Sequence, residues 1–323
     1  MLTALLVTAL TFCQAFENPC ADGFIPFPRA EKGIYECDSN IDAYNSAMQY
    51  LEYNLPSFDV PNKVTLGFNE DQADAVDGLD FGVANYGTNL SLSVRTQYKW
   101  AADVEKDIYN EYVLPYANVN EGRSNWRELL LSAVQEIFSA YTVEEQDKWT
   151  VSDVVSIVNA NLWSNNTVLG KSIVFKSSQT PLIYDSMSTL AFGYASCTGV
   201  SIFFVNALRS VGVPARVAGT PAWNNDASHG NHNWVEVYLA NENSDGGVWS
   251  FIEAAPAGGG ETLANPCDKW FCNPSNFANG TEVYAVRFNQ RSLVRYPMAW
   301  DLTNIAIPGD NMSRQYQSQC NSC

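Results

Sequence analysis

The sequence is poor in histidine and in basic residues. It contains 2 His, and its 18 Lys and Arg face 35 Asp and Glu, for a formal net charge of −17. Nucleic acids and anionic membrane surfaces attract basic proteins. The charge balance therefore predicts neither a nucleic-acid partner nor binding to an anionic membrane surface. A histidine-dependent mechanism has only His229 and His232 to use.

Long apolar runs are also scarce. The clearest one covers roughly a dozen residues from Leu2 to Phe12, too short to span a bilayer, and small residues follow at Cys13 and Ala15. This pattern predicts a secretory signal over residues 1–15, and we expect no membrane insertion of the remainder. Four Asn-x-Ser/Thr sequons favour glycosylated surface loops in an extracellular protein: Asn89, Asn165, Asn279 and Asn311.

The cysteine count is odd once the signal is set aside. Of 8 cysteines, Cys13 lies in that segment, so the seven that remain leave one thiol over. Six of them lie near the ends of the chain or in close pairs and predict up to three disulfides: Cys20, Cys37, Cys267, Cys272, Cys320 and Cys323. Zinc bound by the last four is the alternative. Cys197 stands alone in the middle of the chain.

Periodicity divides the chain into a mainly helical region over residues 16–145, an α+β core over 146–295 and a cysteine-containing tail over 296–323. Residues 16–40 look irregular. Apolar spacing predicts helices over 41–55, 97–142 (broken at Pro115 and restarting near Ser124) and 150–163, and a short strand over 172–176. The acids in 69–82 recur every third residue, which favours a solvated helical face over a calcium loop.

The segment that begins at Cys197 has the pattern of a helix packed on one side. Its apolar residues recur at helical spacing from Val200 to Val211, Ser196 suits the N-cap, and Gly212 suits the position after the C-cap. Cys197 is thus predicted in the first turn, where the helix dipole favours a thiolate. The N–H groups of such a turn can also hold an oxyanion.

Two strands that follow bring an imidazole and a carboxylate together. After a strand over 215–220, "HNWVEVYL" and "VWSFIE" alternate as a hairpin. A register with Val237 opposite Val248 also sets His232 opposite Glu253. A carboxylate beside an imidazole orients it as a base. The sequence therefore predicts nucleophilic catalysis by Cys197, with His232 as base and Glu253 as orienting acid. His229 is the alternative base, in a loop that holds it less firmly.

Three blocks resemble the transglutaminase-like core: "GYASCTGVSIFFVNALRSVGVPARVAGTPAW", "GNHNWVEVY" and "VWSFIEAAP". The resemblance covers roughly residues 105–275. It implies a papain-like cysteine fold, with the nucleophile helix packed on an antiparallel sheet, and maps the triad onto Cys197, His232 and Glu253. The family usually has Asp at the third place. Gln179 is a candidate oxyanion donor by analogy. No cofactor or metal is expected.

Three functions remain open at this stage. The resemblance implies thioester-mediated acyl transfer from peptide or glutamine amides of a protein or peptide substrate to an amine. With water as acceptor, the same residues give a peptidase or amidase. The third function is a non-catalytic secreted binding module, which the unusual Glu253 favours. The sequence does not set the oligomeric state.

Overall fold

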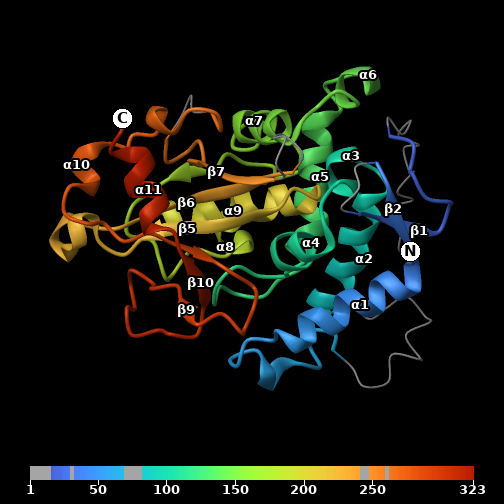
Figure 1. Cartoon of the computed structure of the whole chain (residues 1–323), viewed down its shortest axis with the longest axis horizontal. Coiled ribbons are helices and arrows are strands. Elements are labelled where there is room, and N and C mark those ends of the chain that lie inside the picture. The colour runs from blue at the N-terminus through green and yellow to red at the C-terminus, as the bar shows by residue number, and fades with distance from the viewer. Residues whose placement is uncertain (1–15, 30–32, 69–81, 241–246, 259–261) are drawn as a thin grey trace, which may run out of the picture.

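The computed structural model describes residues 16–29, 33–68, 82–240, 247–258 and 262–323. The predicted signal over 1–15 and nearly all of the acidic stretch 69–82 lie outside these ranges. The described residues form a mixed structure of helices and one main sheet (Figure 1), so the prediction of an α+β fold is confirmed.

The main sheet has six antiparallel strands in the order β7-β6-β5-β8-β10-β9. Their bounds are β5 Ala215–Thr220, β6 His232–Leu239, β7 Val248–Ile252, β8 Tyr284–Val286, β9 Val294–Arg295 and β10 Pro308–Asn311. Residues 215–220 form a strand as predicted. The predicted tail contributes β10, which pairs with both β8 and β9.

The two faces of the sheet pack into different cores because side chains alternate along a strand. Val235 and Val237 of β6 belong to the core that contains α9 (Cys197–Ser210). Trp234, directly before Val235 and therefore on the opposite face, belongs to a second core with Phe251 of β7 and Tyr316 of α11 (Ser313–Cys320). Helix α9 thus packs on one face of the sheet and α11 packs on the other (Figure 1).

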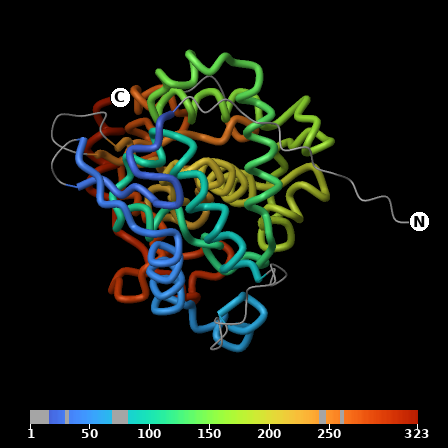
Figure 2. Tube along the Cα trace, turned by 90° about the vertical axis from the view of Figure 1, so that its right-hand side faces the viewer, coloured from blue at the N-terminus to red at the C-terminus, as the bar shows by residue number. Residues whose placement is uncertain are grey.

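Helix α9 is the central helix of the molecule. Every residue from Thr198 to Ser210 is buried, and Figure 2 shows the helix nearly end-on, surrounded by the other elements. Gly212 has a φ of 81° after the helix end, as expected. Ser196 takes the N-cap position, but its hydroxyl does not cap the helix. Instead it lies 2.5 Å from the Thr180 hydroxyl.

The helices packed against α9 include α5 (Trp126–Phe138), α7 (Val151–Asn161) and α8 (Ser186–Phe192). Helix α5 begins after Asn125 and not after the predicted Ser124. Helix α7 starts at a capping box, in which Thr150 and Asp153 bond to each other's backbone N–H. The predicted strand over 172–176 is reduced to β3 (Val174–Phe175), which pairs in parallel with β4 (Tyr194–Ala195).

The N-terminal part of the chain contains β1 (Phe24–Pro28), β2 (Tyr35–Ser39), α1 (Asn40–Tyr53), η1 (Val60–Asn62), α2 (Val83–Arg95), α3 (Lys99–Ala102), α4 (Lys106–Tyr112) and α6 (Val143–Gln146). Residues of β1, α1, α2 and α4 form a separate hydrophobic cluster with Phe288, whereas Trp100 of α3 belongs to the core around α9. The expectation of an irregular segment over 16–40 is wrong, because β1 and β2 pair there as an antiparallel hairpin. The Cys20–Cys37 disulfide ties this hairpin to the residues before it.

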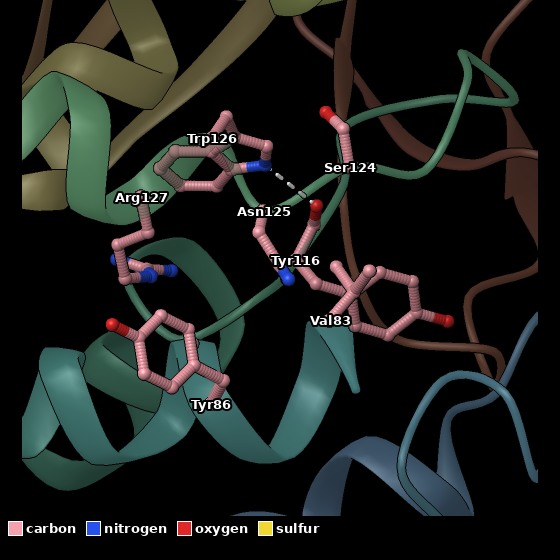
Figure 3. Close-up of a pocket in the computed structure, with 8 residues that line it drawn as sticks. Val83, Tyr86, Tyr116, Ser124, Asn125, Trp126 and Arg127 are labelled. Atoms are coloured by element: carbon pink, nitrogen blue, oxygen red, sulfur yellow. Dashed lines mark hydrogen bonds between the residues drawn. The ribbon is translucent and has the colours of Figure 1, made fainter. Parts of the chain in front are cut away.

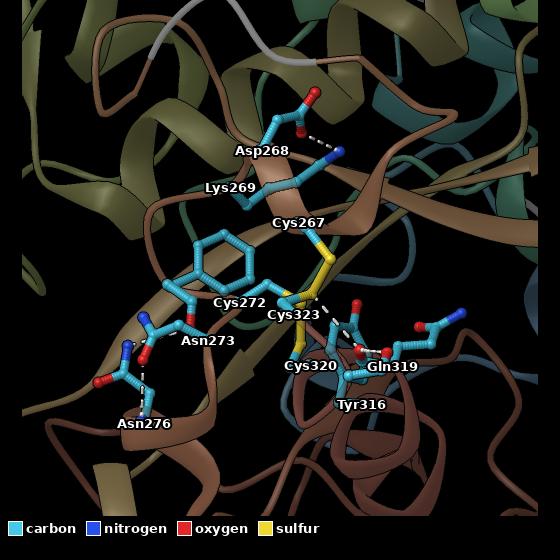
Figure 4. The surroundings of a disulfide bond; sticks show 12 residues. Cys267, Asp268, Lys269, Cys272, Asn273, Asn276, Tyr316, Gln319, Cys320 and Cys323 are labelled. Atoms are coloured by element: carbon cyan, nitrogen blue, oxygen red, sulfur yellow. Dashed lines mark hydrogen bonds and ion pairs between the residues drawn. A yellow bond between two sulfur atoms is a disulfide. The ribbon is translucent and has the colours of Figure 1, made fainter.

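Two further disulfides lie together near α11 and the short helices η5 (Pro266–Asp268) and α10 (Pro274–Phe277). Cys267 pairs with Cys323 and Cys272 pairs with Cys320 (Figure 4). With Cys20–Cys37 these confirm the prediction of three disulfides. The zinc alternative is wrong for this structure, because the four cysteines it needs are bonded to one another.

The surface has two features that bear on the predicted compartment. Within the described part of the chain, no helix combines the length and the apolarity that a bilayer span needs. The four sequon asparagines are exposed. Asn165 and Asn279 lie between elements, as expected, whereas Asn89 lies in α2 and Asn311 ends β10.

Candidate active site

The first turn of α9 presents Cys197 at the end of the sheet where β6 begins. Two contacts fix this arrangement: Thr198 Oγ1 donates to Asn233 Oδ1 at 2.7 Å, and Ser201 Oγ donates to the Asn233 carbonyl at 3.2 Å. Cys197 is partly exposed and is the free cysteine of the described residues. An added Cβ at Gly199 would lie 2.5 Å from the Ala195 Cβ, so this turn packs too tightly for a larger residue.

His232 and Glu253 lie on one face of the β6–β7 hairpin, but the predicted register is wrong by two residues. Val237 pairs with Ser250 and not with Val248, and Val235 pairs with Ile252. A shift of two keeps the parity of the side chains. Glu253, directly after β7, therefore still reaches His232 diagonally.

The two side chains form a short buried contact. His232 Nε2 lies 2.5 Å from Glu253 Oε2, and the side chains are 6% and 0% exposed. The contact occupies Nε2 and leaves Nδ1 as the ring nitrogen available to the Cys197 thiol, whose pKa depends on His232. The structure thus joins the three residues in the order Cys197, His232, Glu253.

The pKa values of Cys197 and His232 shift in opposite directions. Burial alone would lower the pKa of His232, but the charge of Glu253 and hydrogen bonds with Cys197 and Glu253 raise it to about 10. Burial alone would raise the pKa of the Cys197 thiol. The hydrogen bond and charge of His232, with the Asn233 N–H, outweigh that effect and lower it. The arrangement favours a thiolate beside an imidazolium.

Asn159 of α7 holds the backbone around Glu253. Its Nδ2 donates to the Glu253 carbonyl at 2.9 Å, and its Oδ1 accepts from the Ala255 N–H at 2.9 Å. This residue is not among those predicted from the sequence. A signal was available, because Asn159 lies four residues after Val155 and therefore on the buried side of the predicted helix. A buried amide needs hydrogen-bond partners, which marks such a residue as structurally important.

Two other residues weighed from the sequence have different surroundings. Gln179 lies in the loop between β3 and α8, next to Thr180, whose hydroxyl contacts Ser196. Its side-chain amide donates to the Ser177 carbonyl at 3.0 Å. His229 is exposed in η4 (Ala227–His229), which follows η3 (Trp223–Asn225). The structure brings His232, and not His229, into contact with Glu253.

Pockets that Cys197 does not line occur in the N-terminal part of the chain. One is lined by α2 and the segment before α5 and includes Tyr86, Tyr116, Ser124 and Trp126 (Figure 3). There the Trp126 indole N–H donates to the Tyr116 carbonyl at 2.9 Å. No group of three or more His, Cys, Asp or Glu placed to hold a metal ion occurs in the described ranges.

Comparisons with known proteins assign part of the chain to a family. The transglutaminase-like superfamily model matches residues 145–254, which contain Cys197, His232 and Glu253. No curated protein matches the chain. Among solved structures, the transglutaminase of red sea bream is similar over 53% of this chain and 35% of its own, at 14% identity and a TM-score of 0.34. The matched part is thus about a third of that enzyme. Residues 145–254 form a transglutaminase-like superfamily domain.

Proposed function

We propose that this protein is a secreted cysteine enzyme that transfers acyl groups from peptide or glutamine amides through a thioester on Cys197. One observation carries the proposal: the free thiol of the described chain is hydrogen-bonded to His232, which is itself bonded to the buried Glu253. A packed structural cysteine needs no such partners. The same three residues lie within the matched superfamily domain.

In the acylation half, the Cys197 thiolate attacks the amide carbonyl carbon and forms a C–S bond, which places negative charge on the oxygen. The first-turn N–H groups of α9 can stabilise that charge, since the Ser196 side chain does not cap them. The C–N bond then breaks. His232 gives its proton to the leaving nitrogen, and a thioester and a neutral imidazole remain.

In the deacylation half, an amine or water attacks the thioester carbonyl and gives a proton to His232. The C–S bond breaks, which releases the new amide or acid and restores the thiolate beside the imidazolium. Glu253 keeps Nε2 of His232 occupied throughout, so that Nδ1 performs both proton transfers. The acceptor distinguishes a transglutaminase activity from an amidase activity.

The proposed extracellular location has separate support. Three disulfides hold the described chain, and disulfides persist mainly in oxidising compartments. The formal net charge of −17 also favours a protein that stays dispersed.

The test is alkylation of the non-reduced protein with iodoacetamide from pH 4 to 9, read by peptide mass spectrometry. We expect labelling at Cys197 with an apparent pKa well below about 8.5, and a return toward that value in His232→Ala. The matched control His229→Ala should behave as wild type. An inert Cys197, or an unchanged profile in His232→Ala, would overturn the catalytic proposal.

The acceptor is then assigned with a glutamine-containing peptide. Incubation with a fluorescent primary amine tests for amide formation, and incubation without it tests for ammonia release and a glutamate product. Cys197→Ser should abolish both. An amine product at a rate above hydrolysis assigns an acyltransferase, and hydrolysis alone assigns an amidase.

A further inference from the structure

A half-exposed tryptophan covers the buried pair of the site. The Trp270 ring centroid lies 4.7 Å from that of His232. Its indole N–H donates to Glu253 Oε2 at 3.3 Å, the oxygen that also contacts His232. Trp270 is nevertheless 52% exposed. A large aromatic ring with one side in solvent and its polar atom directed at a buried carboxylate contributes little to an ordinary core.

The loop that carries Trp270 is anchored on both sides. Cys267 and Cys272 bracket it, and each is bonded to a cysteine of the segment 320–323 at the end of α11 (Figure 4). The buried Lys269 Nζ donates to the carbonyls of Thr262 and Asn265.

Phe271, on the other side of Trp270, is fully buried and stacks on Trp234 at 4.5 Å. The neighbours of Trp270 therefore fix the backbone of the loop, and the Trp270 ring itself packs over His232 and Glu253.

We propose that Trp270 is a positioning residue for the His232–Glu253 pair and that the disulfide-anchored loop 267–272 holds it there. The inference deepens the proposed function and rests on it, because it concerns how the base of that mechanism is held. The ring excludes water from one side of the pair, and the indole N–H fixes the oxygen of Glu253 that contacts His232.

The physical reason is the local dielectric. The attraction between an imidazolium and a carboxylate weakens steeply when water reaches the pair. A tryptophan face near a cation also favours its charged form. Loss of the ring should therefore make His232 easier to deprotonate and return the Cys197 thiol toward ordinary behaviour. A purely structural tryptophan would change the melting temperature and leave that titration unmoved.

The experiment measures the alkylation rate of Cys197 by iodoacetamide against pH in Trp270→Leu, Trp270→Phe and wild type, with folding checked by circular dichroism. Trp149→Phe, in an aromatic cluster with Trp100 and Phe138, is the control. We expect Trp270→Leu to raise the apparent thiol pKa by about one unit, a roughly tenfold loss of rate near pH 6. Trp270→Phe, which keeps a ring but loses the N–H, should shift it less, and Trp149→Phe should not shift it.

A further variant tests the anchor. Cys267→Ser/Cys323→Ser removes the exposed disulfide and leaves the buried Cys272–Cys320 bridge, so it should shift the profile in the same direction by a smaller amount. If Trp270→Leu and Trp270→Phe fold and their Cys197 alkylation profiles match that of the wild type, the inference is overturned while the proposed function stands. An ordinary thiol profile in the wild type, unchanged by His232→Ala, would overturn both.

Discussion

Two buried ion pairs involve strand β6, and they differ in what surrounds them. Arg216 Nε donates to Glu236 Oε2 at 2.7 Å, and both side chains are 1% exposed. His232 and Glu253 are similarly buried at the start of the same strand. The first pair joins β5 to β6 inside the sheet. The second lies beside Cys197 at the end of the sheet, where β6 begins and β7 ends.

The Arg216 pair is held by many other polar groups. Arg216 also contacts Asp310 at 2.8 Å, and Glu236 Oε1 accepts from the Tyr316 hydroxyl at 2.9 Å. Burial would lower the pKa of Arg216, but Glu236 raises it above its ordinary value. Arg216 therefore stays charged throughout the working pH range. His232 carries a proton that it can lose, so a similar buried pair becomes useful for proton transfer.

The largest expected effect comes from removing the proton carrier. His232→Gln should lower the rate of acyl transfer by about 10²–10⁴-fold, because it removes the imidazole that protonates the leaving nitrogen in the proposed mechanism. The measurement is kcat/KM with the glutamine peptide, and His229→Gln is the control. Equal losses in both variants would contradict the assignment of His232.

Breaking the structural pair should affect stability and not the titration of the thiol. Arg216→Met leaves Glu236 buried without its partner and should lower the free energy of unfolding by roughly 3–5 kcal/mol. Urea unfolding measures it. Arg216→Met/Glu236→Leu removes both charges and should recover part of the loss. An altered alkylation profile of Cys197 in the folded single variant would contradict the separation of the two pairs.

The pH dependence of stability should distinguish the pairs as well. The folded pKa of His232 is raised from 6.5 to about 10, so its stabilisation is fully present below pH 6.5 and is lost as pH rises toward 10. The slope for one proton is at most about 1.4 kcal/mol per pH unit. Urea unfolding of Cys197→Ala should show this loss of stability without the titration of the Cys197 thiol. The loss should end somewhat below pH 10, because Cys197 no longer contributes to the raised pKa of His232.

Cys197→Ala/His232→Gln serves as the reference for this measurement. If the difference in unfolding free energy between the two variants stays constant from pH 6 to 10, His232 has no raised pKa.

The smallest expected effect concerns the backbone of Glu253. Asn159→Ala removes the partners of the Glu253 carbonyl and the Ala255 N–H and should cost roughly 1–3 kcal/mol in unfolding free energy. It should also reduce kcat more than it changes KM, because Glu253 is displaced. Asn161→Ala, exposed at the end of the same helix, should be near neutral. Equal effects of the two substitutions would show that Asn159 does not support the position of Glu253.

Local patterns were sufficient to predict α9, β5, β6 and the parity of the site residues. Apolar spacing and the glycine after the helix mark α9, and alternation marks the strands. The register was missed by two residues because the pattern repeats every second residue, so a shift of two satisfies it equally well. The contact between His232 and Glu253 survives that error, while the catalytic roles stay a prediction.

Features that depend on distant parts of the chain could not be predicted. β8 and β10 are short and pair across long separations, and β1 and β2 lie in a segment rich in Pro and Gly. Asn159 and Trp270 become supports of the site only when α7 and the disulfide-bonded loop meet the end of β7. Residue type alone does not reveal such contacts.

The free thiol has a consequence for how the protein must be made. Seven cysteines in residues 16–323 can form three bridges in about 105 ways, counting seven choices of the thiol left out and 15 pairings of the rest. The native bridges close separations of 17, 56 and 48 residues, whereas Cys197 is far along the chain from every other cysteine. Oxidative folding must therefore form these three bridges and leave Cys197 as a thiol. A preparation in which Cys197 has been oxidised would be silent in the assay, which makes the titre of reactive Cys197 the proper measure of correctly oxidised protein.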